Sequence, residues 1–322
     1  MKKIILLIIN LILLVLIVFG MIVLFKDKVG NADVFVNNSN LKIVTTLFPE
    51  YDFAKQIVGD KANVSLIMKS GVETHNFEPT AKDIIEINSS DLFITLGEEL
   101  EPWVKDISAS IENKEKIFNV TNNIELISQD FFEEKHEEEH DHEHEESHDS
   151  HVWLSPKNAK IMIDNILGRI IEIDPENKEF YIDNAEKYKN EIDILDKQLR
   201  EEIFNNKNIV LAVGGEFAYS YFVKEYDVNF VSVYTNCGHG EDPSIARVKS
   251  VIDIINDKKI PVVFYEELSE GLVAKMIAEE TNAEAKVLYT IHNGNISGEE
   301  KDTYVSLMKK NIENIKLLVN DK

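Results

Sequence analysis

The chain has 322 residues, of which 44% are hydrophobic, so it can bury a sizeable core and form about two domains. Its formal net charge of -24 at pH 7 disfavours nucleic acids and anionic lipids as partners and favours cations. The one cysteine, Cys237, excludes an intramolecular disulfide and lies far from the N-terminus, where a lipid-attachment cysteine would stand.

The first predicted element is a membrane segment. Residues 4–25 form an apolar run of 22 residues that only Asn10 interrupts, with lysines on both sides. A helix of this length, at about 1.5 Å per residue, crosses a hydrocarbon core of about 30 Å. We expect residues 1–28 to be an uncleaved anchor, or else a signal segment cleaved near Ala32, followed by a spacer over residues 29–40. The leading lysines place the rest of the chain on the outer face of the cytoplasmic membrane.

Short β-rich runs then alternate with segments of helical period. The expected strands are residues 41–47, 63–68 and 91–96, and the expected helices are residues 50–58 and one that starts near Thr80. This alternation is typical of an α/β lobe with a mainly parallel sheet, which we place at residues 41–173.

The last third of the chain repeats this alternation and predicts a second α/β lobe over residues 206–322. The expected strands are residues 208–213, 229–233, 261–265 and 286–289, and one helix is expected at residues 217–226. Another helix is predicted to start with Asp242 as its N-cap and Pro243 at its first position.

Between the two lobes, residues 174–205 show one sustained helical period. Apolar residues recur there at spacings of three and four: Tyr181, Ala185, Tyr188, Ile192, Leu195, Leu199 and Ile203. The pattern predicts one amphipathic helix about 40 Å long. It is either a rigid linker between two lobes or a core helix of a single domain.

Residues 133–150 interrupt the alternation with a run of acidic residues and histidines that has almost no apolar residue. Five histidines lie within it: His136, His140, His142, His144 and His148. Such a segment cannot bury a core, and we expect a solvated loop. Its imidazoles indicate weak accessory metal binding, the alternative being a solvated charge run.

Four further candidate metal ligands lie just after a predicted strand or just before an apolar segment. His75, Glu216 and His292 each follow a predicted strand, and His151 is followed by the apolar run Val152-Trp153-Leu154. The carboxyl ends of parallel strands are the usual ligand sites of α/β sheets. Two donors from each lobe predict a tetrahedral metal site in a cleft between the lobes.

Several segments together resemble one known family. They are GVETHNFEPT at residues 71–80, the histidine-rich insert, HVWLSP at 151–156, DPEN at 174–177, EFAYSYF at 216–222, EDPS at 241–244 and DTY at 302–304. In this order and spacing they resemble the metal-binding receptors of zinc and manganese ABC importers, also described as adhesin-like lipoproteins. The resemblance covers roughly residues 41–319.

The resemblance implies two lobes joined by a rigid helix, with a metal held between them by one residue from each of four motifs. His75 and His151 match the first two ligands of the family. The third is commonly histidine in zinc receptors and glutamate in manganese receptors, and here it falls on Glu216. The fourth is usually acidic, but His292 is the donor at that place in this chain.

Three other residues near these motifs have side chains that could bind or support a metal. His239 is an alternative ligand or an accessory surface residue, against a plain loop role. Glu266 and Glu267, which follow a predicted strand, are expected to be hydrogen-bond acceptors rather than ligands.

Three histidines and one carboxylate favour Zn(II) as the transported ligand, with Mn(II) as the alternative, because zinc prefers imidazole and manganese prefers oxygen. A zinc hydrolase is disfavoured, since it needs an open coordination position and the sequence has no HExxH motif. A metal-binding surface adhesin is a further alternative. The resemblance implies an ABC permease and its ATPase as partners, and we expect a monomer.

Overall fold

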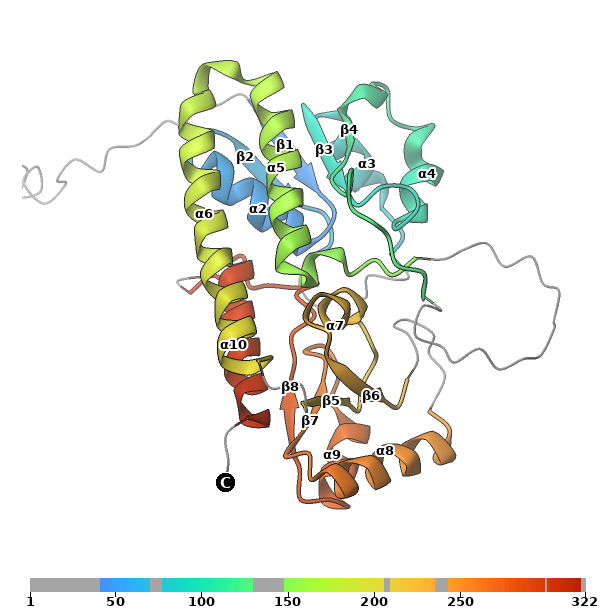
Figure 1. Ribbon diagram of the computed structural model, residues 1–322. Helices are drawn as coiled ribbons and strands as arrows, with labels where there is room; N and C mark the ends of the chain where they lie inside the picture. The colour runs from blue at the N-terminus through green and yellow to red at the C-terminus, as the bar shows by residue number, and fades with distance from the viewer. Residues whose placement is uncertain are drawn as a thin grey trace, which may run out of the picture. The chain divides into compact units, whose positions relative to one another are not determined.

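The computed structural model describes residues 41–69, 77–129, 148–205, 209–234, 243–298 and 300–319 (Figure 1). Its strands form two four-stranded sheets, and every strand pair in both sheets is parallel. Helices connect the strands, as parallel pairing requires. The predicted α/β class is confirmed.

The first sheet has the order β2-β1-β3-β4. Its strands are β1 (Lys42–Thr45), β2 (Asn63–Leu66), β3 (Leu92–Thr95) and β4 (Ile117–Asn119). Three of them, β1, β2 and β3, lie within the predicted runs. The last three residues of β1 and all four of β3 are apolar or β-branched and are buried at the centre of the sheet. β4 has three half-buried residues at the edge, and the sequence pattern missed it.

Three helices belong to this first sheet: α2 (Phe48–Val58), α3 (Ala81–Asn88) and α4 (Pro102–Ser108). The predicted start of α3 near Thr80 is confirmed, since Thr80 is its N-cap and forms a capping box with Asp83. The Thr80 backbone N–H donates to Asp83 Oδ2 at 2.7 Å. This cap fixes where the helix begins after the undescribed residues 70–76.

The second sheet has the order β6-β5-β7-β8. Its strands are β5 (Val210–Val213), β6 (Asn229–Ser232), β7 (Val262–Tyr265) and β8 (Glu284–Val287). The helices that follow its strands are α7 (Ser220–Tyr226), α8 (Ile245–Lys258), α9 (Leu272–Glu279) and α10 (Tyr304–Ile315). This arrangement repeats the strand order of the first sheet, as two similar lobes would.

Some predicted boundaries in this part of the chain are wrong. The N-cap of α8 is Ser244, whose hydroxyl accepts from the Arg247 N–H at 3.2 Å, so the helix begins after Pro243 rather than at it. α7 begins at Ser220 instead of residue 217, and β8 ends at Val287 instead of residue 289. Glu284 and Lys286 lie in this edge strand, and their polarity hid its true start.

Two long helices, α5 (Pro156–Ile173) and α6 (Lys178–Gln198), lie side by side (Figure 1). α6 continues as a π-helical turn over Leu199–Ile203. All seven apolar residues of the predicted period are buried, which confirms the long amphipathic helix. α6 also contacts α2 and α10, so it packs against helices from both ends of the described chain.

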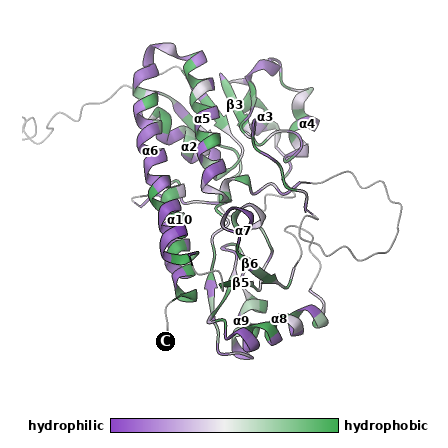
Figure 2. Cartoon of the chain, viewed as in Figure 1, coloured by the Kyte–Doolittle hydropathy of each residue, from purple (hydrophilic) through white to green (hydrophobic). Residues whose placement is uncertain are grey.

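One hydrophobic core joins the two sheets through these helices. It includes Phe53 of α2, Trp153, Tyr188 of α6, Phe264 of β7 and Tyr304 of α10. Figure 2 shows hydrophobic residues on β3 and β6 and mostly hydrophilic residues along α6. Residues from Ser39 to Lys322 form one compact unit, and the predicted lobe boundaries at residues 173 and 206 remain a prediction.

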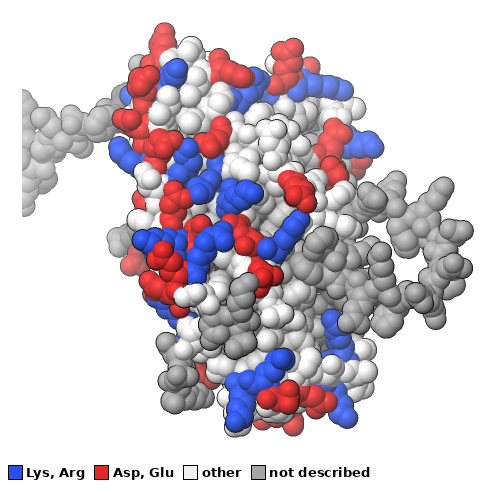
Figure 3. Space-filling model, in the orientation of Figure 1, with Lys and Arg blue, Asp and Glu red and all other residues white. Residues whose placement is uncertain are grey.

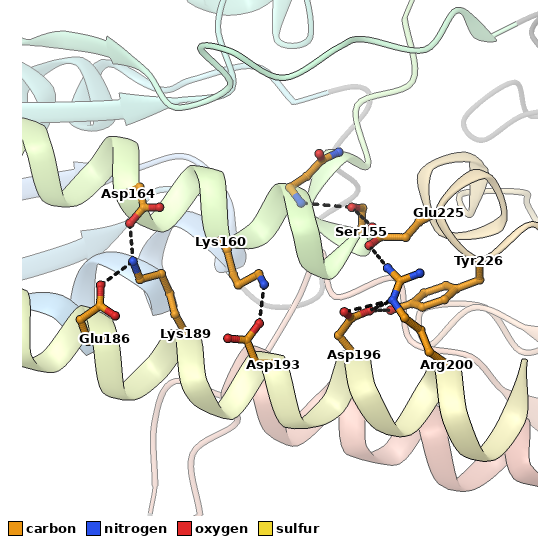
Figure 4. A network of polar contacts seen from close by, with 11 residues as sticks. Ser155, Lys160, Asp164, Glu186, Lys189, Asp193, Asp196, Arg200, Glu225 and Tyr226 are labelled. Atoms are coloured by element: carbon orange, nitrogen blue, oxygen red, sulfur yellow. Dashed lines mark hydrogen bonds and ion pairs between the residues drawn. The ribbon is translucent and has the colours of Figure 1, made fainter. Parts of the chain in front are cut away.

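Ion pairs cover the surface of α5 and α6, where Figure 3 shows acidic and basic side chains next to one another. Lys189 of α6 contacts Asp164 of α5 at 2.7 Å, and Arg200 contacts Glu225 of α7 at 2.6 Å (Figure 4). Exposed pairs contribute only about 0.2–1 kcal/mol each. The buried apolar face therefore does more than these charges to hold α6 in place.

Within the described residues, from 41 onward, no helix combines the length and the apolarity that a bilayer crossing requires. The predicted anchor over residues 1–28 and the spacer over residues 29–40 lie outside the described residues.

Candidate metal centre

The structure describes some of the predicted ligands. His151, Glu216 and His292 are described, and so is His148 of the histidine-rich segment. The others lie outside the described residues: His75, His136, His140, His142, His144 and His239.

His151 and His292 lie against each other in the interior. Their ring centroids are 4.6 Å apart with the ring planes at 74°, and the residues are 2% and 7% exposed. His151 precedes the short turn Val152–Leu154 that leads into α5, and His292 follows β8 of the second sheet. Two of the predicted ligands, from distant parts of the sequence, are thus brought together.

The ring of His151 is oriented by a buried carboxylate. Its Nδ1 lies 2.5 Å from Asp149 Oδ1, which also accepts from the His151 backbone N–H at 2.8 Å. Burial raises the pKa of Asp149, but the charge and the hydrogen bonds of His151 outweigh it and hold this pKa below its usual value. For the neutral ring that can bind a metal, we assign the one proton to Nδ1, which leaves the Nε2 lone pair to face the ion.

The ring of His292 is oriented through a hydroxyl. Its Nδ1 lies 2.8 Å from Thr290 Oγ1, which in turn lies 3.0 Å from Glu267 Oε1. If the hydroxyl donates to the carboxylate, it accepts from Nδ1–H of His292, and Nε2 again carries the lone pair. The carboxylate of Glu267 therefore acts on His292 through Thr290.

Glu267 also fixes the backbone that carries His292. Its carboxylate accepts from the Thr290 N–H at 2.7 Å and from the Ile291 N–H at 3.0 Å. Ile291 has φ 63°, a left-handed conformation that is costly for a β-branched residue. Burial raises the pKa of Glu267 in spite of these hydrogen bonds. The expectation that Glu267 is a hydrogen-bond acceptor is confirmed.

Trp153 joins the two histidine segments. Its ring centroid is 5.5 Å from that of His151 and 5.3 Å from that of His292. Its indole N–H donates to the Thr290 carbonyl at 2.8 Å, and its own carbonyl accepts from Tyr304 OH at 2.8 Å. Because Trp153 is fully buried, both imidazoles rest on a fixed aromatic surface.

Glu216 is half-buried on the loop after β5. Its backbone N–H donates to Glu266 Oε2 at 3.1 Å, which confirms Glu266 as an acceptor. A Cβ at Gly215 would lie 1.9 Å from the same oxygen, so any other residue there would displace the Glu266 carboxylate. Burial and then the charge of Glu216 raise the pKa of Glu266.

Within the part of the chain that the structure describes, no group of three or more His, Cys, Asp or Glu side chains is arranged to hold a metal. His151 and His292 are therefore two candidate ligands that lie together, and the described residues alone do not extend them to a set of three. The four-residue site that includes His75 and Glu216 remains a prediction.

His148 lies at the end of the histidine-rich segment and beside a hollow of about 190 Å³. Its Nδ1 is 2.9 Å from Glu99 Oε1, and its backbone pairs with Ser128 in an isolated antiparallel bridge. The hollow is lined by Glu99, Glu101, Trp103, His148 and His292, among others. His148 and one of the paired imidazoles thus line the same space, and its accessory role remains a prediction.

Sequence reasoning missed Asp149 and Thr290 as ring partners. Both stand two residues before their histidine, in Asp149-x-His151 and Thr290-x-His292. This repeated spacing was the available signal, because a side chain two positions away can reach back to Nδ1 when the backbone turns between them.

Comparison with known proteins decides what the site belongs to. A family model described as the periplasmic component A of the zinc-uptake complex matches residues 43–317. The chain belongs to this family. The resemblance found in the sequence is thereby confirmed, and the family is a solute-binding receptor for zinc uptake rather than an enzyme.

Individual relatives agree with this assignment. The chain is 36% identical over 291 residues to the high-affinity zinc uptake system protein ZnuA of Bacillus subtilis, covering 89% of both chains. It is 32% identical over 307 residues to the zinc-binding protein AdcA of Streptococcus pyogenes, covering 92% of this chain but 59% of that relative. The chain therefore spans about three-fifths of the length of AdcA.

A solved relative shows the same fold. The crystal structure of the Zn(II)-bound ZnuA-like domain of Streptococcus pneumoniae AdcA is 27% identical with a TM-score of 0.71, covering 87% of this chain and 99% of that one. The two-lobed architecture expected of the zinc-uptake family is therefore present here.

Proposed function

We propose that this member of the zinc-uptake family captures Zn(II) outside the cytoplasm and delivers it to an ABC permease and its ATPase. The observation that carries the proposal is the buried pair of His151 and His292, whose rings lie 4.6 Å apart. A carboxylate backs each ring at Nδ1, directly for His151 and through Thr290 for His292. Both Nε2 atoms are then poised to bind one ion.

His75 and Glu216 are proposed to complete the coordination. Four protein ligands close a zinc site and leave no position for a reactive water, which suits a carrier. Imidazole favours zinc over manganese, and the two described histidines support this preference. Glu216 is the ligand that favours manganese, so Mn(II) is the competing ion.

The proposed site binds metal only when its imidazoles are neutral, because a protonated ring has no lone pair for the ion. Zinc affinity is expected to fall as the pH drops. The N-terminal segment over residues 1–28 would hold the receptor at the outer face of the membrane, close to the permease.

The test is competitive binding of Zn(II) and Mn(II), measured with a chromophoric chelator, on the full chain and on a variant that lacks residues 133–147, which keeps Asp149 beside His151. One zinc ion that survives loop deletion and is lost in His75→Ala, His151→Ala, Glu216→Ala and His292→Ala supports the proposal. Metal that disappears with the loop alone would overturn it, and preferential binding of manganese would reassign the ion.

Delivery needs a separate test in cells. Loss of the gene should impair growth under zinc limitation, and the full chain should restore it while His151→Ala should not. Restoration by His151→Ala would separate the growth phenotype from the proposed site.

A further inference from the structure

Two carboxyl groups lie together in the core of the first lobe, apart from the paired histidines. Glu50, in the first turn of α2, is 0% exposed, and Glu101, which precedes α4, is 4% exposed. The Thr46 hydroxyl lies 3.3 Å from Glu50 Oε1 and 3.1 Å from Glu101 Oε2. The Leu96 N–H donates to Glu101 Oε2 at 2.6 Å.

This pair lacks the charge balance that two carboxylates need. Among the described residues, no lysine, arginine or histidine forms an ion pair with Glu50 or Glu101. Glu50 Oε2 and Glu101 Oε1 are buried and have no hydrogen-bond partner in this part of the chain. Two adjacent negative charges in the interior are strongly unfavourable, so the pair retains a proton.

The surroundings indicate when this proton can leave. Burial and then the charge of Glu101 raise the pKa of Glu50 well above its usual value, and burial raises the pKa of Glu101 to about 7. The single hydroxyl hydrogen of Thr46 can be donated to only one of the two carboxyls at a time. The pair therefore exchanges a proton close to neutral pH.

The pair lies next to a hollow that His292 also lines. Glu101 lines the same hollow of about 190 Å³ as His292. The other titratable groups that line this hollow are Glu99 and His148, which contact each other at 2.9 Å. A dication held by His292 would lie at the wall of this hollow, where its charge favours the ionised form of Glu101.

We propose that Glu50 and Glu101 form a proton-binding site that is coupled to metal capture. The pair holds a proton while the metal site is empty. When a divalent cation binds, the carboxylic O–H bond breaks, the proton passes to solvent, and the remaining carboxylate adds negative charge beside the cation. The inference rests on the proposed function, because it takes His292 as a ligand of the cation.

The coupling has a consequence for zinc release. Acidification returns the proton to the pair and removes negative charge from the wall of the hollow, which weakens zinc binding in addition to the protonation of the imidazoles. The receptor thus senses pH through two separate sets of groups.

The proton count per zinc ion tests this proposal. Zn(II) is titrated into the full chain by calorimetry at pH 6.5, in buffers of different ionisation enthalpy. The unmodified chain should release about one proton more per zinc than Glu101→Gln, and Glu50→Gln should also release fewer protons. The imidazoles contribute equally in all variants, so the difference belongs to the pair.

Asp52→Asn is the matched control. Asp52 is another buried acid of α2, with its pKa raised to about 6 by burial, but it faces Tyr188 and Tyr304 instead of the hollow. Its variant should release as many protons as the unmodified chain. An equal reduction in Asp52→Asn would overturn the proposal.

A second measurement is spectroscopic. The infrared difference spectrum of the unmodified chain should lose a protonated carboxyl band when zinc is added, and this loss should be missing from the same spectrum of Glu101→Gln. Persistence of the band in the unmodified chain, or an equal loss in both chains, would overturn the proposal. If the unmodified chain and its Glu101→Gln variant bind zinc with the same proton release, the coupling proposed here is refuted and the proposed zinc-binding function stands. Failure of the unmodified chain to bind zinc would instead refute the proposed function.

Discussion

The two histidine segments reach the same arrangement by different means. His151 takes its carboxylate from Asp149, two residues earlier, whereas His292 takes its support from Glu267 through the Thr290 hydroxyl. In both cases the carboxylate holds the ring proton on Nδ1 and leaves Nε2 for a metal. The first arrangement is local in sequence, and the second depends on β7 and β8 lying side by side.

This difference separates charge from geometry. Asp149 places a full negative charge against the ring of His151 at 2.5 Å. The ring of His292 contacts a neutral hydroxyl. Glu267 accepts hydrogen bonds from the backbone N–H groups of Thr290 and Ile291, in the turn where Ile291 has a left-handed conformation. We therefore expect His151 to depend on its partner for charge and His292 to depend on its partner for position.

The largest expected effect comes from removing either ring. His151→Ala and His292→Ala should each reduce zinc affinity by more than the roughly 100-fold that loss of an outer hydrogen-bond partner can cost. Chelator competition measures the change, and Asp52→Asn serves as the control because Asp52 does not line the hollow beside His292. Unchanged affinity in either variant would show that the two segments do not share one ion.

Replacing the ring partners should give smaller losses that differ from each other. Asp149→Asn should weaken zinc binding by roughly 10- to 100-fold, and Thr290→Val should weaken it less, because Asp149 alone places a charge at the ring. The same competition assay ranks them. The reverse order would mean that the charge of Glu267 reaches His292 more effectively than that of Asp149 reaches His151.

Trp153→Phe should loosen the contact between the segments that carry His151 and His292. The variant keeps an aromatic ring but loses the indole hydrogen bond to Thr290, at a cost of about 1–3 kcal/mol in the free energy of unfolding. Urea unfolding measures stability, and the visible spectrum of bound Co(II) reports the geometry of the site. Tyr226→Phe is the control, because Tyr226 donates a hydrogen bond to Asp196 and does not line the hollow beside His292, and an equal spectral change in both variants would contradict this role.

The smallest expected effect on zinc binding is that of Asp52→Asn, which acts on stability alone. Burial raises the pKa of Asp52 from 3.8 to about 6, so the folded state binds this proton more tightly than the unfolded state does. The stabilisation is complete below about pH 3.8 and is lost as the pH rises through about 6.

Asp52 should therefore make the free energy of unfolding of the unmodified chain fall by up to about 3 kcal/mol between pH 4 and pH 7. Asp52→Asn should remove this part of the pH dependence and leave zinc affinity unchanged. Urea unfolding across this pH range measures it. A variant whose stability depends on pH as steeply as that of the unmodified chain would assign the effect to other groups.

Periodicity and strand composition predicted most of the fold. The spacing of the seven apolar residues along α6 and its π-helical continuation, and the apolar composition of β1 and β3, were enough to predict these elements. β4 has only three residues, and the start of α8 depends on which polar residue caps it, so neither was predicted correctly. Local signals this weak are decided by tertiary contacts.

For the candidate site, the sequence indicated which residue types to examine but not their partners. His151 and His292 were predicted as ligands, and the structure brings their rings together. The pairing of Glu50 with Glu101 could not be foreseen, because a glutamate in the first turn of a helix normally indicates an exposed N-terminus. Only the packing of α2 against the segment before α4 buries both groups.

The hydrogen bond between the Tyr304 backbone N–H and Asp52 Oδ2 joins residues 252 positions apart in the sequence. It ties the start of the last long helix to the first helix of the described chain. Contacts between such distant residues slow folding, because a long loop must close before they form. A chain that lacks its last residues cannot form this hydrogen bond, so the packing around Asp52 is complete only when α10 is available.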